Sequence, residues 1–386
     1  MSTRQISDVR TVLVGLGFIG HVHLDALRRL GVQVVGVLDA TPELAKAEAD
    51  AAGIPRAYRD LDELAADRTV DVVHVTSPNH VHAPQALALL RAGKNVVCEK
   101  PLAMNVAQGR EMVAAAKAAG VVTAVGFHNR FYPMSAQAKA MVASGEVGSV
   151  RLVTGHYLQD WLSLETDWSW HLEPELGGDT RAVGDIGSHW IDLVEHVTGE
   201  RIVEVLADFA TFIPVRKKPL GEVRTFAAAG AGPTQDVPIS TEDAALVLLR
   251  FDGGARGQFA VSQVSPGRAN QLRYEVAGSQ LSLGWESEHS EDLWIGRRGA
   301  ASEVMQRDPR VVVPQAAGWL PAGHSQGLPD AFMAMYRAVY ADIVNPTGGT
   351  PYYATFADGL RGLLVEDAIL SSARTGAWTT VEGEGV

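Results

Sequence analysis

Three side chains in this 386-residue chain have the types and settings needed to move protons at a hydroxyl group: Lys100, Asp185 and His189. Lys100 lies in Glu99-Lys100-Pro101, where the proline fixes its own φ and disfavours a helical backbone at the lysine. The side chain is therefore expected to project from a defined place, although a solvated loop lysine is the alternative. A lysine cation stabilises a developing alkoxide, and histidine is well matched to accepting a proton near neutral pH.

Asp185 and His189 belong to the segment 184–192, Gly-Asp-Ile-Gly-Ser-His-Trp-Ile-Asp. Together with Asp192 they follow the spacing i, i+4, i+7, which predicts that all three lie on one face of an α-helix. On that face Asp185 can bind a substrate hydroxyl or orient the imidazole of His189. Two carboxylates and a histidine can also hold a metal ion. We predict no metal, because a lysine cation can itself polarise an alcohol.

A glycine-rich loop over 15–20, Gly-Leu-Gly-Phe-Ile-Gly, joins the first predicted strand to the first predicted helix. Gly15 permits a tight turn, Gly17 lets the backbone approach a pyrophosphate, and Gly20 lets helix and strand pack closely. Asp39 ends the next strand, where its carboxylate can accept hydrogen bonds from both ribose hydroxyls and repel a 2′-phosphate. We therefore expect a dinucleotide, and NAD rather than NADP. The alternative is a glycine turn that serves packing only.

The other candidate binding residues follow predicted strands, or are aromatic and polar side chains suited to a sugar ring. The predicted cofactor-binding residues are Gly15, Gly17, Phe18, Ile19, Gly20, Asp39, Ser77, Asn79, His82, Glu99 and Lys100. The predicted substrate-binding residues are Lys100, Arg130, Tyr157, Gln159, Trp161, Trp170, Arg181, Asp185, His189 and His324. For about half of such aromatic residues, the alternative is a place in the core.

Arg181 lies just before the predicted catalytic helix in a chain that is acidic overall. Its guanidinium can form a bidentate pair with a carboxylate, phosphate or sulfonate of the substrate. It can equally form a salt bridge with Asp179 or Glu175. The sequence leaves both interpretations open.

The first third of the chain alternates between β-branched runs and helical patterns, which predicts a parallel sheet with helices on both faces. The expected strands are 9–15, 33–38, 70–76, 95–98 and 121–126, and the expected helices reach residue 30, open at Thr41-Pro42-Glu43, and span 84–91 and 106–119.

The sequence pattern changes after residue 126, where strand patterns separated by turns predict a mostly antiparallel sheet. The expected strands are 150–159, 202–212, 244–251, 256–263, 272–277, 280–284 and 293–295, with helices near 185–198, 329–343 and 355–373 and an Ala/Gly-rich loop over 226–232.

These patterns predict an α/β protein of two domains. The first, over 1–126, is an NAD-binding Rossmann domain with a doubly wound parallel sheet. The second, over 127–386, is an α+β domain with a large open sheet for substrate binding and oligomerisation, and its C-terminal helix can pack back on the first domain.

Composition excludes several other classes of protein. Lys and Arg number 33 against 45 Asp and Glu, and the net charge of −12 argues against nucleic-acid and anionic-membrane partners. Cys98 is the single cysteine, so no internal disulfide and no cysteine-based zinc site can form. No run of 18 apolar residues occurs, and the N-terminus lacks the apolar core of a signal peptide. We therefore expect a cytoplasmic protein.

The glycine loop, Glu99-Lys100-Pro101 and the segment 185–192 together resemble the Gfo/Idh/MocA oxidoreductases over nearly the whole chain. Within that family, segments 157–161 and 238–243 are most similar to levoglucosan dehydrogenase and other glycoside-oxidising members. The resemblance implies a Rossmann domain, a C-terminal domain with an open sheet, and homodimers or homotetramers built through sheet faces. It also implies a lysine–aspartate–histidine site, which matches Lys100, Asp185 and His189.

Three functions are compatible with these residues. The first is an NAD-dependent dehydrogenase of a small carbohydrate, polyol or glycoside, acting at the 3-hydroxyl. The second is a glycosidase of the same family that keeps NAD bound and recycles it, for which Arg181 suggests an anionic substrate such as a sulfoquinovoside. The third is a non-catalytic NAD-binding sensor, against which the intact Lys100, Asp185 and His189 argue.

Overall fold

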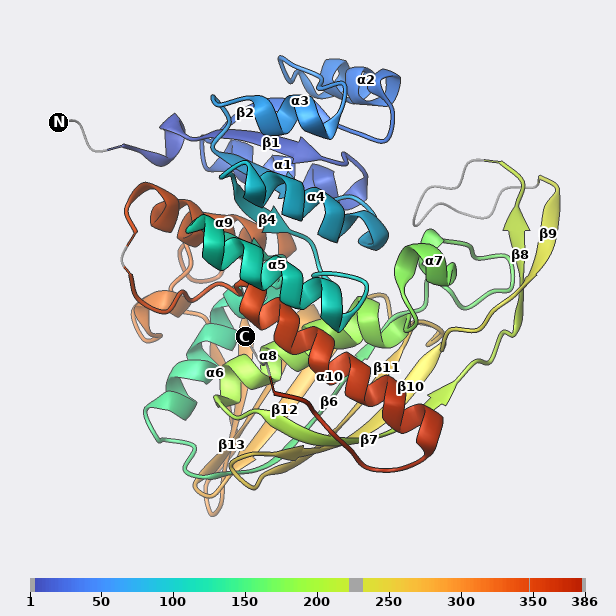
Figure 1. Ribbon diagram of the computed structural model, residues 1–386. Helices are drawn as coiled ribbons and strands as arrows, with labels where there is room; N and C mark the ends of the chain where they lie inside the picture. Colours follow the sequence, from blue (N-terminus) through green and yellow to red (C-terminus); the bar gives the residue numbers. More distant parts are fainter. Residues whose placement is uncertain (1–3, 222–231, 347, 384–386) are drawn as a thin grey trace. The chain divides into compact units, whose positions relative to one another are not determined.

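The computed structural model describes residues 4–221, 232–346 and 348–383 (Figure 1). The expected loop over 226–232 therefore lies outside the described residues, apart from Gly232. The described residues form two compact units. The first contains the chain up to Phe131 together with Leu328–Leu363, and the second contains Tyr132–Gly327 together with Leu364–Gly383. No helix among the described residues is long and apolar enough to cross a membrane.

The first unit is built on a five-stranded sheet in the order β2-β1-β3-β4-β5, in which every neighbouring pair is parallel. Its strands are β1 Arg10–Val14, β2 Gln33–Leu38, β3 Val72–Val75, β4 Asn95–Cys98 and β5 Thr123–Val125. Its helices are α1 Phe18–Arg29, α2 Pro42–Ala52, α3 Leu61–Ala66, α4 Asn79–Arg91, α5 Val106–Ala119, α9 Leu328–Val344 and the start of α10 Phe356–Thr375, with short 3₁₀ turns η1 Ile6–Asp8 and η2 His128–Phe131. The predicted doubly wound parallel sheet is confirmed.

Local capping explains where several of these helices begin. The side chains of Thr41, Asp60 and Asn105 each accept a hydrogen bond from a backbone N–H in the first turn of α2, α3 and α5. The helix α4 begins at Asn79, five residues before the expected start at Pro84, and the proline is accommodated inside it. Reading Pro84 as a helix start was therefore wrong, because this helix tolerates the missing N–H.

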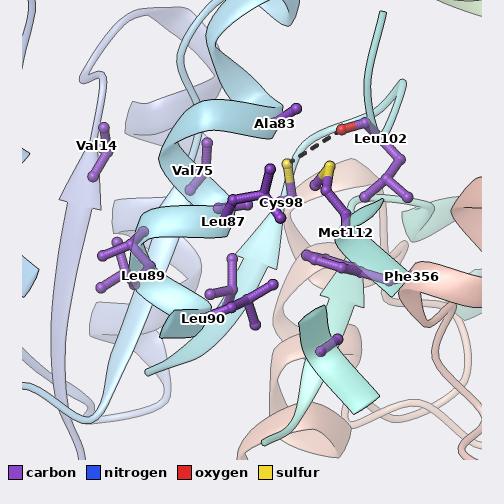
Figure 2. Packing of buried hydrophobic residues seen from close by; sticks show 14 of the residues in the cluster. Val14, Val75, Ala83, Leu87, Leu89, Leu90, Cys98, Leu102, Met112 and Phe356 are labelled. Atoms are coloured by element: carbon purple, nitrogen blue, oxygen red, sulfur yellow. Dashed lines mark hydrogen bonds between the residues drawn. The ribbon is translucent and has the colours of Figure 1, made fainter. Parts of the chain in front are cut away.

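Two hydrophobic clusters cover the two faces of the parallel sheet. One joins β-strand residues to α1 and α9, with Leu24, Leu27 and Tyr336 among its members. The other joins the strands to α4, α5 and the start of α10 (Figure 2). Cys98 is fully buried in this second cluster, where burial raises the pKa of its thiol well above the usual value. It therefore serves packing.

The second unit is built on a nine-stranded sheet in the order β15-β14-β13-β12-β6-β11-β10-β7-β16. Its strands are β6 Val150–Leu158, β7 Ile202–Ala210, β10 Ala244–Phe251, β11 Arg256–Ser262, β12 Gln271–Gly278, β13 Leu281–Glu286, β14 Asp292–Arg297, β15 Glu303–Gln306 and β16 Thr379–Thr380, and a separate hairpin contains β8 Val215–Pro219 and β9 Thr234–Pro238. The pairs are antiparallel except β6 with β11, which is parallel. The predicted mostly antiparallel sheet is confirmed.

Helices of the second unit cover one face of this sheet. The helix α8 Ser188–Thr198 packs on β6 and β12, and α6 Pro133–Ala143 packs on β13 and β14 (Figure 1). The indole of Trp190 in α8 stacks on Phe259 of β11, with ring centroids 4.5 Å apart. The sequence analysis missed α6, whose alanine-rich segment lacks a marked apolar stripe. The remaining short helices are η3 Trp170–Leu172, α7 Pro174–Gly177, the π-helix η4 Val183–Gly187, and the 3₁₀ turns η5 Ser287–His289 and η6 Pro314–Ala316.

Candidate functional site

The predicted cofactor-binding residues line one edge of the parallel sheet. The carboxyl ends of all five strands meet at this edge, and the order β2-β1-β3-β4-β5 places Asp39, the glycine loop, Ser77 and Lys100 there in succession. Neighbouring strands lie about 4.8 Å apart, so the ends of β2 and β4 are about 14 Å apart. The edge thus offers an acidic group at one end and a lysine at the other, with a phosphate-binding loop between them.

The glycine loop fits a pyrophosphate. Gly15 has φ +87°, and a Cβ there would lie 3.0 Å from the backbone of Ser77, so a side chain is excluded. A Cβ at Gly20 would also collide with the backbone oxygen of Gly15, because α1 approaches the loop closely. At Gly17, by contrast, a Cβ would meet no atom within 4 Å. Gly17 is the N-cap of α1, and it leaves open space at the positive end of that helix, where a phosphate binds well.

Asp39 is held in place by the backbone. Its Oδ2 accepts a hydrogen bond from the N–H of Leu16 at 2.8 Å, and its Oδ1 accepts one from the N–H of Ala40 at 2.7 Å. A carboxylate has about four lone-pair sites, so each oxygen keeps acceptor capacity for a ribose hydroxyl. The loop and Asp39 therefore fit the dinucleotide NAD, which would supply the hydride acceptor when bound.

His82 has a structural role in addition to the one expected. It is fully buried, with Nδ1 2.9 Å from the carbonyl oxygen of Pro101 and Nε2 2.8 Å from that of Ser77. Burial lowers the pKa of His82 against the opposing effect of these carbonyl groups. The ring lies between the loops after β3 and β4, which gives His82 a structural role, and a contact of this side chain with the cofactor stays a prediction. His82 positions Ser77, whose hydroxyl in turn donates to Gln85 at 2.6 Å.

Lys100 follows β4 and is half-buried. Its backbone N–H donates to Oε2 of Glu99 at 3.2 Å, and the Lys100-Pro101 peptide bond is cis. A Cβ at Gly126 would lie 2.1 Å from Oε1 of Glu99, so glycine leaves the space that this carboxylate fills. Burial opposes ionisation of Glu99, but a hydrogen bond with His23 and the charge of Lys100 outweigh it and lower the pKa of Glu99.

Asp185 and His189 lie in the second unit, and their local geometry departs from the expected α-helix. Residues Val183–Gly187 form a π-helix, and α8 begins only at Ser188. The spacing i, i+4, i+7 on a single α-helical face is therefore wrong for Asp185, although His189 and Asp192 do share α8. The two glycines of the segment 184–187 have no side chains to crowd the wider π-helical turn. Such turns are common at functional sites.

Asp185 has two polar neighbours that the sequence analysis missed. Its Oδ2 accepts a hydrogen bond from Nε2 of Gln263 at 2.7 Å, and its Oδ1 lies 3.7 Å from Nε2 of His171. The other ring nitrogen of His171 lies 2.8 Å from the hydroxyl of Ser169, and the ring stacks on Trp170 with centroids 3.7 Å apart. Asp185 thus has an imidazole beside it, supplied by the 3₁₀ turn η3.

The predicted sugar-binding side chains form one hydrogen-bonded group around Asn270. The hydroxyl of Tyr157 and the amide of Gln159 both donate to Oδ1 of Asn270, at 2.7 and 2.8 Å, and Trp161 donates to Gln159 at 2.7 Å. The ring of Tyr157 lies 6.3 Å from that of His189. Asn270 was not predicted. Its bonds hold an aromatic and amide surface in a fixed arrangement near His189.

Both interpretations of Arg181 from the sequence are wrong. Its side chain is fully buried, and its guanidinium pairs with Asp243, which also binds Arg216 at 2.8 Å. The expected partner Asp179 instead lies 3.3 Å from Arg374. A buried and paired guanidinium does not present itself to an anionic substrate, so the reason for expecting a sulfonated sugar is removed.

Glu242, the residue before Asp243, caps the N-terminus of the π-helix with its side chain. Its Oε1 accepts hydrogen bonds from the backbone N–H groups of Arg181 and Val183, at 2.9 and 2.8 Å. Burial raises the pKa of Glu242 despite these bonds. A side-chain carboxylate from a distant loop thus caps the helix that carries Asp185. The buried pair Glu242 and Asp243 therefore positions the candidate site.

Two further predicted substrate-binding residues have structural partners. Arg130 is buried in the first unit and donates to Asp358 at 3.0 Å. His324 is exposed in a loop of the second unit, with its Nδ1 3.3 Å from the carbonyl oxygen of Ala322. The fully buried Arg307 holds that loop by donating to four of its backbone carbonyl groups. A contact of Arg130 or His324 with substrate stays a prediction.

No cluster of three or more histidine, cysteine, aspartate or glutamate side chains suited to a metal ion occurs in the described part of the chain. His171 lies in the short 3₁₀ turn η3, and Gln263 and Asn270 lie just outside β11 and β12. The signal in the sequence was indirect: Gln263 is the last residue of a predicted strand, and His171 lies in an aromatic segment already assigned to the site.

Two family models match the chain. Residues 9–127 match the oxidoreductase family model GFO_IDH_MocA, described as an NAD-binding Rossmann fold, and residues 135–283 match the GFO/IDH/MocA C-terminal domain. The cofactor prediction of NAD is thereby confirmed.

Several known proteins with similar sequences or structures are named for sugars or polyols, and others for trans-1,2-dihydrobenzene-1,2-diol. The chain is 29% identical to levoglucosan dehydrogenase of Pseudarthrobacter phenanthrenivorans over 97% of this chain and 99% of that protein. A solved structure of levoglucosan dehydrogenase with NADH and L-sorbose covers 97% of this chain and 99% of its own, with a TM-score of 0.86 and 27% identity. An inositol dehydrogenase homologue from Azotobacter vinelandii, with NADH and myo-inositol, covers 96% and 97%, with a TM-score of 0.84 and 26% identity.

Proposed function

Because the chain belongs to the Gfo/Idh/MocA oxidoreductase family, we propose that it oxidises a secondary hydroxyl, at C3, of a sugar, polyol or glycoside with NAD as hydride acceptor. The sugar and polyol names of its relatives support this substrate class. The observation that carries the proposal is the order of groups along the edge of the parallel sheet. That order begins at Asp39 and ends at Lys100, where the reacting end of the dinucleotide would lie.

The residue types assign the chemical roles. His189 is the general base that removes the hydroxyl proton. Lys100, as a cation, donates a hydrogen bond to the reacting oxygen and stabilises its alkoxide character. Asp185, oriented by the amide of Gln263, holds a neighbouring hydroxyl. The surface of Tyr157, Gln159 and Trp161 supports stacking on a sugar ring.

The position of His171 favours keeping a second candidate function, a glycosidase that recycles bound NAD. Oxidation at C3 acidifies the C2 hydrogen, so an aglycone can leave by elimination and water can add before the hydride returns. Such a sequence needs one more group that gives and takes a proton. His171, 3.7 Å from Asp185, is a suitable second imidazole.

A panel of sugars, polyols and glycosides, assayed with excess NAD and with substoichiometric NAD, separates the candidates. Steady accumulation of NADH supports the dehydrogenase. Release of aglycone with no net NADH supports the glycosidase. NAD binding without either signal on any compound would contradict both and favour a sensor.

The role of Lys100 has its own test. We expect Lys100→Ala to lower turnover by about 10²–10³-fold while NAD affinity is retained, because the glycine loop and Asp39 are untouched. Lys117→Ala, on the exposed face of α5, is the matched control and should leave turnover unchanged. Unchanged turnover in Lys100→Ala would refute the role of this lysine.

We also propose that the open face of the nine-stranded sheet binds a second copy of this chain. Leu152, Leu246 and Leu248 are 46%, 61% and 44% exposed on β6 and β10, which lie within three neighbouring strands. Charged pairs such as Arg250 with Glu204 lie beside them. A self-complementary apolar patch with a charged rim suits a twofold interface, and the family resemblance implies such sheet-face dimers.

A further inference from the structure

A continuous chain of hydrogen bonds runs through the interior of the first unit and ends on Glu99, the residue before Lys100. Its contacts are Glu99 Oε1 to His23 Nε2 at 2.9 Å, His23 Nδ1 to His74 Nδ1 at 2.9 Å, His74 Nε2 to Tyr340 Oη at 2.9 Å, and Tyr340 Oη to Thr11 Oγ1 at 2.8 Å. Glu99 is 4% exposed and the other four residues are 0% exposed. The five side chains come from five different elements, so this arrangement exists only in the folded protein.

When His23 is neutral, the chemistry of the groups fixes the direction of every hydrogen bond in this chain of contacts. The carboxylate of Glu99 can only accept, so His23 must donate from Nε2. A neutral His23 then has a bare Nδ1, which accepts from Nδ1–H of His74. The bare Nε2 of His74 in turn accepts from the hydroxyl of Tyr340, and Tyr340 accepts from Thr11. All donors therefore point toward Glu99.

The same five residues can hold one more proton without losing a bond. If His23 gains a proton, the new N–H bond forms at Nδ1 and donates to Nδ1 of His74. His74 then carries its single proton on Nε2 and donates to Tyr340, which donates to Thr11. His74, Tyr340 and Thr11 end with as many protons as before, and only His23 changes charge. The carboxylate of Glu99 balances that charge across 2.9 Å.

The surroundings favour His23 as the place for this proton. Burial and the neighbouring His23 lower the pKa of His74 well below the usual value, and burial lowers the pKa of His128 to about 4. The other titratable groups around this pair are Lys100, whose charge acts on Glu99, and Tyr336 on α9, whose ring lies 5.1 Å from that of His23. Burial raises the pKa of Tyr336 far out of the physiological range. Among these groups, Glu99 is the anion that can stabilise an imidazolium.

We propose that His23 is a one-proton store linked to the state of the cofactor, with Glu99, His74 and Tyr340 as positioning residues. This inference rests on the proposed function, in which the nicotinamide lies beside Lys100. Oxidation of an alcohol moves two electrons and one hydrogen as hydride and releases the hydroxyl hydrogen as a proton. It also removes the positive charge of the nicotinamide near Glu99. Loss of that charge raises the proton affinity of the Glu99–His23 pair, so His23 takes up a proton when the reduced cofactor is bound.

The direct test is the number of protons exchanged on binding. Heats of binding NAD⁺ and NADH, measured at one pH in buffers of different ionisation enthalpy, give the proton uptake of each complex. At a fixed pH we expect the NADH complex to hold a measurable fraction of a proton more than the NAD⁺ complex, because Glu99 can balance the added charge on His23. His23→Gln keeps a donor for Glu99 and an acceptor for His74 but cannot bind a proton, so this difference should disappear.

His289→Gln is the matched control, because it removes an exposed histidine of the second unit that forms an ion pair with Glu286. It should keep the wild-type difference. An equal proton difference in wild type and His23→Gln would overturn the store, even if both cofactors bind normally. Failure of either cofactor to bind the wild-type chain would refute the proposed function itself, and the store with it.

A measurement on the unmodified chain is independent of any variant. Above the titration range of imidazole, nitrogen chemical shifts should show the Nε2–H tautomer for His23 and the Nδ1–H tautomer for His74. The opposite tautomers, or rapid exchange between the two tautomers of either histidine, would contradict the fixed direction of these hydrogen bonds.

Discussion

Replacing Asp243 by asparagine tests whether the buried charges beneath the π-helix hold the second unit together. Asp243 is completely buried, and its Oδ1 is shared by the guanidinium groups of Arg181 and Arg216. Its Oδ2 accepts a hydrogen bond from the backbone N–H of Ile213 at 2.8 Å. Asparagine keeps the size of the side chain and one oxygen acceptor, but it removes the negative charge from two buried cations.

The expected loss of stability follows from that arrangement. Removing one partner of a buried ion pair costs about 3–5 kcal/mol, because the remaining charge stays buried without compensation. Here two guanidinium groups lose their shared carboxylate. For a unit of roughly 200 residues, 1 kcal/mol lowers the midpoint of thermal unfolding by about 2–4 °C. We therefore expect a decrease of about 10 °C or more, and a lower turnover because the helix carrying Asp185 loses its support.

Thermal unfolding followed by calorimetry is the assay. The control is Asp236→Asn on β9, where Asp236 is 69% exposed and lies 3.4 Å from Lys217. An exposed pair of this kind contributes at most about 1 kcal/mol. NAD binding, which depends on the first unit, should survive in both variants. Unfolding midpoints of the two variants within about 2 °C of each other would refute the assigned role of the buried cluster.

Two further predictions concern acid stability and assembly. Burial lowers the pKa of His128 to about 4, against about 6.5 in an unfolded chain. As pH falls, His128 is therefore protonated in the unfolded chain before it is protonated in the folded protein. About 3 kcal/mol of folding stability is lost as pH falls from about 6.5 to about 4. Urea unfolding at several pH values should show a weaker dependence in His128→Gln, and an equal dependence would contradict this account. Leu246→Asp, on the exposed sheet face, should reduce the mass measured by light scattering to that of a monomer. An unchanged mass in this variant, or a monomeric wild type, would exclude that face as the interface.

The parallel sheet and its edge were predictable because their signals are local. Gly15 is needed for turn geometry and Gly20 for close packing, Gly17 leaves open space at the start of α1, and Asp39 follows a strand of recognisable pattern. Once the strands are known to be parallel, their carboxyl ends must meet at one edge. The placement of Ser77 and Lys100 beside the loop follows from topology alone.

The geometry around Asp185 was not predictable in the same way. The sequence indicates a helix, but it does not distinguish an α-helical turn from the π-helical one over Val183–Gly187. That turn depends on Glu242, whose carboxylate accepts hydrogen bonds from backbone N–H groups of a segment about sixty residues earlier. The partners of Asp185 likewise come from loops without periodicity. Such positions are set by tertiary contacts, and local patterns carry no information about them.

Arg181 and His23 show why residue type alone misleads in both directions. An arginine beside a candidate site in an acidic chain suggests an anionic ligand, yet this guanidinium is buried and pairs with Asp243 inside the protein. A histidine after a glycine loop suggests a helix-surface or pocket-lining residue, yet His23 is completely buried and bonded to the carboxylate next to Lys100. The difference lies in which buried carboxylate each group meets. Asp243 lies between two permanent cations and keeps their charges fixed. Glu99 instead bonds to the imidazole of His23, so under the proposed proton store a change in cofactor charge acts at Glu99 rather than at Arg181.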